Sequence, residues 1–194
     1  MHARVLAPVF VVAVVAAFAC GGSSDSPTAA SRAGATMNLM IKDSPFTDAK
    51  SLLVTFSEVS AHKAEGEWMT LPFSGGASSR TCDIKKLTDA QDVLGTGPLT
   101  PGHYTMIRLE VTSATLYFDN AASGPACAAT VTAPTGKSAP VDVPSGVVRL
   151  NREFDLTSTT ATTMLLDFDG DKSVHTTGNG RYMMTPVIGV VSVQ

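Results

Sequence analysis

The chain has 194 residues, 44% of them hydrophobic, and a formal net charge of −3. This length fits one domain with short appendages, and the apolar content excludes a chain that is disordered throughout. The small negative charge excludes the basic footprint of a nucleic-acid-binding protein, so no nucleic-acid partner is expected. The 23 threonines favour strands over helices.

The N-terminal segment has the pattern of an export signal. Arg4 precedes an uncharged, almost wholly apolar run over residues 5–19. The run is shorter than the ~20 residues of a membrane-spanning helix and is typical of a signal peptide. Ala19-Cys20 resembles a bacterial lipobox, in which the cysteine is lipidated and becomes the mature N-terminus. We therefore predict a lipoprotein signal peptide over 1–19 and a lipid on Cys20; an ordinary signal peptide cut near Ala19 is the alternative.

Residues 20–35 are predicted to be this lipidated N-terminus and a flexible tether. Residues 21–35 are small and polar without periodicity, as flexible linkers are. The membrane is an expected partner through the lipid, because several acyl chains together give stable attachment. Gly21 stands where lipoproteins retained in the inner membrane carry Asp. The expected location is therefore exported and lipid-anchored, with the outer membrane favoured.

The three cysteines divide into two roles. An exported protein with three cysteines has one left over, and a lipid on Cys20 accounts for it. Cys82 and Cys127 remain, in an oxidising compartment where disulfides persist. Neither lies in a Cys-x-x-Cys pair or has a histidine at ligand spacing. We predict a structural Cys82–Cys127 disulfide rather than a redox or metal pair.

Residues 36–194 are predicted to form one all-β domain. Short apolar runs alternate with Gly, Pro and polar clusters, a spacing typical of a β-sandwich. Residues 72–102 are expected to be mostly loop, with a short strand at 83–87 and helical turns in 88–94. Residues 116–118 either continue the strand before them or begin the next. Strands are expected at 36–42, 52–63, 67–71, 106–111, 128–132, 139–143, 147–156, 162–169 and 181–193, the last as a central strand.

Several segments resemble a known family in their order along the chain. They are 42–50 (KDSPFTDAK), 54–59 (VTFSEV), 101–109 (PGHYTMIRL), 166–174 (LDFDGDKSV), 178–182 (GNGRY) and 185–188 (TPVI). The bacterial lipoprotein domain of unknown function DUF4382 has matching segments, and the similarity covers about residues 36–192. The resemblance implies a secreted or surface-anchored Greek-key β-sandwich of about seven to nine strands, similar to transthyretin-like and carbohydrate-binding-like modules, with short helical turns in loops. It carries over no catalytic residues.

The best candidate metal site is the acidic run that contains Asp167, Asp169 and Asp171. Alternation places Asp167 and Asp169 on one strand face, ~7 Å apart, and carboxylate oxygens suit calcium. The run lacks the loop and the final Glu of an EF-hand. Solvated acids paired with nearby arginines are the ordinary explanation. No cofactor is therefore expected, and calcium is kept as the alternative.

Trp68 and Tyr117 are the candidate ligand-binding aromatics, because rings on a sandwich face can stack on sugars or anchor a protein. The simpler interpretation places Trp68, the single tryptophan, in the core. No catalytic residue is assigned, since His62, His103 and His175 have no zinc-ligand spacing.

These observations predict a non-enzymatic, lipid-anchored envelope module that binds a glycan or another envelope protein. That prediction rests on fold-level analogy. An assembly component that pairs edge strands is the alternative, and an enzyme is the third. Binding predicts an exposed aromatic cluster near Trp68 or Tyr117, and buried rings would remove the support for a glycan ligand. Assembly predicts an uncovered edge strand, and an enzyme predicts a pocket that joins a histidine to an acid.

Overall fold

The structure, a computed structural model, describes residues 34–44 and 49–194. The predicted signal peptide, the lipid on Cys20 and the tether up to residue 33 lie outside these residues. Ala35, placed in the tether by the sequence, is the buried first residue of the first strand. No helix of the described residues is both long and apolar enough to cross a membrane.

Strands dominate the described residues, and the helical segments are single turns. The helical turns are η1 (Ser74–Gly76), η2 (Ile84–Leu87) and α1 (Gly170–Ser173). The strands are β1 (Ala35–Ser44), β2 (Ser51–Lys63), β3 (Trp68–Thr70), β4 (Arg80–Asp83), β5 (Asp92–Leu99), β6 (Gly102–Tyr117), β7 (Cys127–Ala128), β8 (Ser138–Asp142), β9 (Val147–Leu156), β10 (Thr162–Asp169), β11 (Val174–Thr177), β12 (Arg181–Met184) and β13 (Ile188–Val193).

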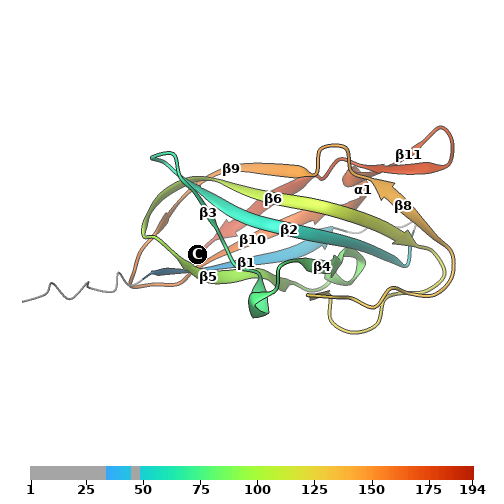
Figure 1. Cartoon of the computed structure of the whole chain (residues 1–194), viewed down its shortest axis with the longest axis horizontal. Coiled ribbons are helices and arrows are strands. Elements are labelled where there is room, and N and C mark those ends of the chain that lie inside the picture. Colours follow the sequence, from blue (N-terminus) through green and yellow to red (C-terminus); the bar gives the residue numbers. More distant parts are fainter. Residues whose placement is uncertain (1–33, 45–48) are drawn as a thin grey trace, which may run out of the picture. The chain divides into compact units, whose positions relative to one another are not determined.

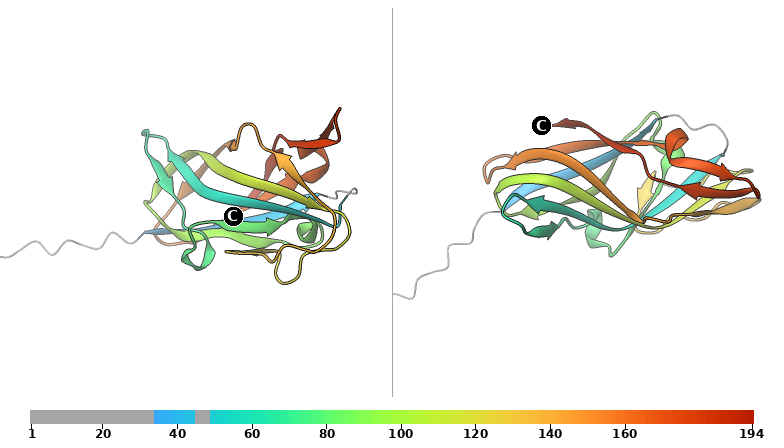
Figure 2. Two further views of the ribbon diagram at one scale, coloured as in Figure 1. Left: turned by 45° about the vertical axis from the view of Figure 1, so that its right-hand side comes forward. Right: turned by 90° about the horizontal axis from the view of Figure 1, so that it is seen from above.

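These strands form two sheets (Figures 1 and 2). The smaller sheet has the order β13-β10-β1-β5, with β1 and β10 parallel. The larger sheet is built on the long antiparallel pair of β2 and β6. One half of that pair is flanked by β3 and β9, and the other half by β4 and β8. Strands β7, β12 and β11 extend the second half.

The core lies between the two sheets, as the two-residue alternation of the sequence predicts. Its fully buried side chains come from both sheets: Leu39, Ile41, Leu166 and Phe168 from the smaller one, and Val54, Phe56, Ile107 and Leu109 from the larger one. In Figure 1, β2 and β6 lie over the β1–β10 pair. The predicted all-β sandwich is confirmed.

The thirteen strands of the described residues exceed the seven to nine that the resemblance implies. Several of the additional strands are only two to four residues long and extend the edges of the larger sheet, as β3, β7, β11 and β12 do. Segments this short are too brief to show a two-residue alternation. Of these four, β3 lies within the strand predicted at 67–71 and β12 within the one predicted at 181–193.

Strand β5 lies in a stretch that the sequence predicts as loop and helical turns. Its residues include Gly95, Gly97 and Pro98, which are depleted in strands. The glycines have a packing reason, because the chain at Leu71 and Pro72 passes close to them. A Cβ on Gly95 would lie 3.0 Å from the Pro72 carbonyl oxygen, and one on Gly97 would lie 2.9 Å from the Pro72 ring. The prediction of loop here is wrong because close backbone approach overrides residue preference.

The predicted central strand over 181–193 is instead two strands. β12 ends at Met184, β13 begins at Ile188, and Pro186 lies between them. Proline has no N–H to donate to a sheet. β13 is an edge strand of the smaller sheet rather than a central one.

The predicted disulfide is confirmed, and it joins Cys82 on β4 to Cys127 on β7. Both cysteines are buried. The Arg80 guanidinium donates to the Cys127 carbonyl at 3.1 Å and lies 3.5 Å from Asp92 on β5. The disulfide therefore fastens the shortest strand to the edge of the larger sheet, beside a buried cation.

Candidate functional site

The outer side of the larger sheet carries an aromatic ring among polar groups. Across β3, β2, β6 and β9, two neighbouring rows of residues are set by the strand register. One row is Trp68, His62, Met106 and Asn151, and the other is Thr70, Ser60, Arg108 and Arg149. We call these two rows the Trp68 face. Their sequence neighbours Ala61, Ile107 and Leu150 are buried on the opposite, core side.

Trp68 lies outside the core, so the interpretation that places it there is wrong. Its neighbour Met69 packs against the core, which turns Trp68 to the outer face by alternation. The indole is half-buried. Its ring centroid lies 4.8 Å from that of His62, and the Arg108 guanidinium carbon lies 4.5 Å from it. A cation over an indole is attractive, so these contacts hold the ring in one position.

Arg108 is the best-connected charge on the Trp68 face. Its guanidinium donates to Glu58 and, at 3.1 Å, to the Ser60 hydroxyl. It also lies 3.8 Å from Glu110. The hydrogen bond from Arg108 holds the pKa of Glu58 below its usual value. The charge of Arg108 is therefore matched by the chain itself.

Arg149 stands directly opposite Arg108 across the β6–β9 pair. It is exposed, and it makes no ion pair with any described residue. Like charges at opposite positions of two strands repel. Arg149 is thus an exposed cation of the Trp68 face that has no ion pair within the described part of the chain.

Tyr117 does not join Trp68 in a single aromatic cluster. The alternation of β6 is interrupted at residues 112–113, and beyond this break Leu116 is buried, so Tyr117 faces the outer side of the sheet. Tyr117 lies eleven residues along β6 from Met106, which is separated from Trp68 in the row by His62. At the rise of an antiparallel strand this is ~35 Å. The two candidate aromatics are therefore separate.

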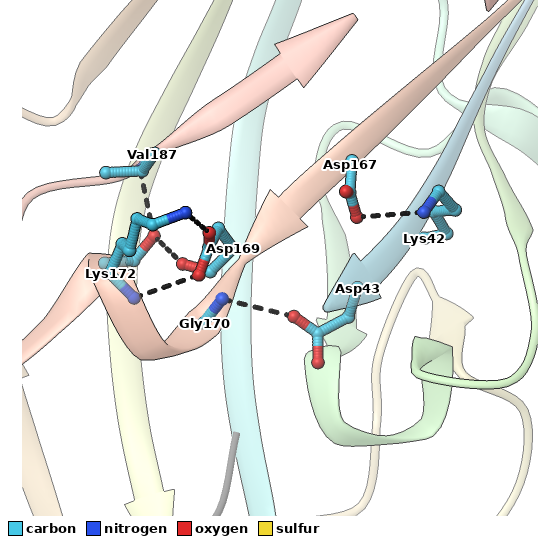
Figure 3. Close-up of polar contacts among 8 residues, drawn as sticks. Lys42, Asp43, Asp167, Asp169, Gly170, Lys172 and Val187 are labelled. Atoms are coloured by element: carbon cyan, nitrogen blue, oxygen red, sulfur yellow. Dashed lines mark hydrogen bonds and ion pairs between the residues drawn. The ribbon is translucent and has the colours of Figure 1, made fainter. Parts of the chain in front are cut away.

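The candidate calcium ligands lie at the end of the parallel β1–β10 pair. Asp167 pairs with Lys42 of β1 at 3.3 Å. Asp169 caps α1, accepting hydrogen bonds from the Lys172 backbone N–H at 3.0 Å and from its ammonium at 2.6 Å. Figure 3 shows these two carboxylates turned to different lysines. The hydrogen bond from the Lys172 side chain lowers the pKa of Asp169 below its usual value.

Asp43 is the residue of this region that the sequence did not single out as a site. It is 2% exposed and accepts hydrogen bonds from the Gly170 N–H at 3.3 Å and the Thr88 hydroxyl at 3.2 Å. Burial raises its pKa to about 7, against the hydrogen bonds from Gly170 and Thr88 and the charge of Lys85. Lys42-Asp43 opens a segment of the family resemblance, which is the signal that could have identified it. We call Lys42, Asp43, Asp167, Asp169 and Lys172 the Asp43 cluster.

The Asp43 cluster does not bring three metal-ligating side chains together. In residues 34–44 and 49–194, no three His, Cys, Asp or Glu side chains lie close enough to hold a metal ion. Asp171 is exposed on α1, outside the contacts of Asp167 and Asp169. The calcium prediction therefore gains no support from the geometry.

A hollow of about 390 Å³ lies beside the Asp43 cluster, lined by Lys42, Thr88, Asp89, Ala90 and Gln91. No histidine lines it. His103 instead pairs with Asp155 at 2.9 Å on the exposed surface, and His62 contacts the Thr105 hydroxyl at 3.1 Å. The hollow and the histidines thus belong to different parts of the domain.

Comparison with known families gives one result. The model of a family described as "Domain of unknown function (DUF4382)" matches residues 34–186. Comparison with curated proteins and with solved structures gives no match. The match spans both the Trp68 face and the Asp43 cluster.

Proposed function

The chain belongs to the DUF4382 family, and we propose that it is an exported, lipid-anchored module of the bacterial envelope that binds a glycan on its Trp68 face. The observation that carries this proposal is the position of Trp68. A half-buried indole on an outer sheet face, fixed by His62 and Arg108, offers an apolar surface for a sugar ring. Hydroxyl and amide groups surround it for hydrogen bonding.

The surroundings of Trp68 suit a polar, ring-shaped ligand. Thr70 and Asn151 are exposed in the same two rows as the indole, and each offers donors and acceptors to sugar hydroxyls. A sheet face of this kind contacts a polymer from one side. A module that holds its ligand in this way needs no pocket, and no catalytic group is assigned to it.

The envelope location rests on the sequence. The signal pattern over 1–19, Ala19-Cys20 and the small, polar stretch after it support export and lipid anchoring. A tether of that composition lets a folded domain reach away from a membrane surface. A bilayer-anchored domain of this kind would meet cell-wall or surface polysaccharides first.

Affinity electrophoresis of the chain without its signal peptide tests the proposal. The gels contain alginate, polygalacturonate, dextran or solubilised peptidoglycan. We expect at least one of them to retard the wild-type chain and Trp68→Ala to abolish the retardation, because tryptophan anchors carry a large share of binding energy.

Tyr117→Ala is the matched control, since it removes an aromatic ring from the same sheet face far from Trp68. It should be retarded like the wild type. Migration of the wild-type chain unchanged by every polymer, or equal retardation of Trp68→Ala, would refute glycan binding by this face.

A second candidate function is assembly through β13, the edge strand of the smaller sheet. The exposed large hydrophobic residues of the described chain are Met183, Val187 and Val191. Val191 lies in β13 and Val187 just before it, whereas Met183 lies on β12 of the larger sheet. Residues 185–194 contain no charge, whereas the edge strand β9 carries Arg149, Arg152, Glu153 and Asp155. An uncharged edge is a template for pairing with another strand.

The structure also explains why assembly ranks second. The register between β10 and β13 skips Val191, which makes a β-bulge there. A bulge at an edge hinders a continuous ladder with a neighbour. Self-association through β13 predicts a dimer in sedimentation experiments that Val191→Lys converts to a monomer; a wild-type chain that is monomeric at all concentrations would contradict it.

A further inference from the structure

We infer that the glycan of the Trp68 face is acidic and that Arg149 binds its carboxylate; this inference rests on the proposed function. The starting point is the Arg108–Arg149 pair. The two residues occupy directly opposite positions on β6 and β9. Two guanidinium groups placed in this way repel unless an anion lies between or beside them.

The chain supplies anions for Arg108 but not for Arg149. Glu58 accepts a hydrogen bond from Arg108, and Glu110 lies 3.8 Å from the same guanidinium. Glu58 lies on β2, on the far side of β6 from β9. Glu110 lies on β6 opposite Val147, two residues along from the Arg108–Arg149 pair, and its ion pair is with Arg108. On β9 itself, the Asp155 carboxylate contacts the His103 ring nitrogen Nδ1 at 2.9 Å. Arg149 is left with five free N–H donors in a fork that fits a carboxylate in two-point contact.

The distance between Arg149 and Trp68 fits an oligosaccharide. Trp68 lies on β3 and Arg149 on β9, at opposite ends of the Trp68 face and in different rows, with β2 and β6 between them. Three strand spacings and an offset of two residues along the strands give ~16 Å. A short chain of sugar rings lying obliquely across the strands would stack one ring on Trp68 and bring the substituent of another to Arg149. Asn151, the exposed neighbour of Arg149 in the Trp68 row, lies beside this path.

The chemistry that fits is a polymer of uronic acids. Its rings provide the faces that stack on an indole, and each ring carries a carboxylate at a regular interval. A neutral glycan would leave Arg149 unpaired in the complex and would displace water from it without compensation. Binding of an acidic glycan relieves the repulsion between the two arginines.

The test compares a tetramer of galacturonic acid with its fully methyl-esterified form, which has the same backbone without charge. Binding is followed by the fluorescence of Trp68, the only tryptophan of the chain. We expect the acid to bind at least about tenfold more tightly than the ester, which corresponds to one charge-assisted contact. Arg149→Gln should remove this preference, and Arg181→Gln, an equal charge change on the exposed strand β12, should keep it.

A second measurement needs no ligand. Because Arg149 repels Arg108 in the free protein, Arg149→Gln should raise the midpoint of thermal unfolding, and Arg181→Gln should leave it unchanged. A lower midpoint for Arg149→Gln would show that Arg149 is satisfied within the chain and would overturn the inference.

The outcomes separate this inference from the proposed function. Equal affinity for acid and ester, or a preference that survives in Arg149→Gln, overturns the acidic ligand while the glycan face stands. If neutral dextran binds, no acidic polymer binds, and Trp68→Ala abolishes the binding, the acidic ligand is likewise overturned and the glycan face stands. Absence of binding to every polymer, with Trp68 fluorescence unchanged, overturns the glycan face itself.

Discussion

The Trp68 face and the Asp43 cluster are both polar regions of one domain, but their charges have different partners. In the Asp43 cluster, Asp167 pairs with Lys42 and Asp169 with Lys172, while Asp43 accepts from Gly170 and Thr88. On the Trp68 face, Arg149 has no ion pair among the described residues.

This difference separates a structural role from a binding role. Charges that the chain satisfies internally tie β1, β10 and α1 together. Under the proposed function, the half-buried indole and an arginine without an ion pair at the opposite end of the Trp68 face offer contacts to a ligand. A cluster of acids read from a sequence is therefore weak support for a metal site until the neighbouring lysines are placed.

The largest expected contrast comes from Asp43→Ala. This change leaves the buried Gly170 N–H without its acceptor and should lower the free energy of unfolding by about 1–3 kcal/mol. Glycan affinity should stay at the wild-type value, because Asp43 lies on the smaller sheet. Urea denaturation and affinity electrophoresis measure the two effects. A loss of binding in correctly folded Asp43→Ala would show that the two regions are coupled.

The pH dependence of stability should come from the Asp43 cluster. The raised pKa of Asp43, about 7 against an ordinary 3.8, means that the folded state binds a proton more tightly than the unfolded state. The free energy of unfolding should therefore fall as the pH rises from about 4 to about 7, by at most ~1.4 kcal/mol per pH unit, and level off above it.

Asp43→Asn is the control for this pH effect, because it keeps the shape of the side chain and removes its titration. Its stability should change less between pH 4 and 7 than that of the wild type. Lys85 and Asp167 act on the same carboxyl in opposite directions and remain in the variant. An identical pH profile for the two proteins would show that Asp43 titrates at its ordinary value.

Trp68→Phe should change stability by less than about 1 kcal/mol. The indole lies outside the core, so its replacement by a smaller ring creates no core cavity. Thermal or urea unfolding measures this directly. A loss of about 3 kcal/mol, the cost of truncating a core aromatic, would contradict the outer position of Trp68.

The smallest expected effect is that of calcium. Because Lys42 and Lys172 occupy Asp167 and Asp169, added calcium should leave the midpoint of thermal unfolding unchanged. A ligand that binds only the folded state raises this midpoint with concentration. A rise that EDTA reverses and that Asp169→Asn abolishes would restore the calcium site.

The strands with strong alternation were predictable from the sequence, and those with special packing were not. The strands at 147–156 and 162–169 have the predicted bounds, because apolar and polar residues alternate along them. β5 was missed because Gly95 and Gly97 serve the close approach of Pro72, which is distant in sequence. Pro186 marks the break before β13 in the sequence, because proline cannot donate to a sheet even within an apolar run.

The candidate site was predictable in its residue types but not in its contacts. The sequence identifies Trp68 as a candidate. Only the pairing of β3 with β2 places its ring beside His62 and within contact distance of the Arg108 guanidinium. The Arg108–Arg149 opposition depends on the pairing of β6 with β9, which no local pattern encodes. The burial of Asp43 likewise depends on α1, which follows it by more than a hundred residues.

Acrylamide quenching of Trp68 fluorescence tests the central claim most directly, since the chain has one tryptophan. The account predicts that acrylamide quenches the free protein readily and that a saturating glycan identified by affinity electrophoresis shields the indole. Quenching as weak as that of a core tryptophan, or quenching that the bound glycan leaves unchanged, would contradict a binding face at Trp68.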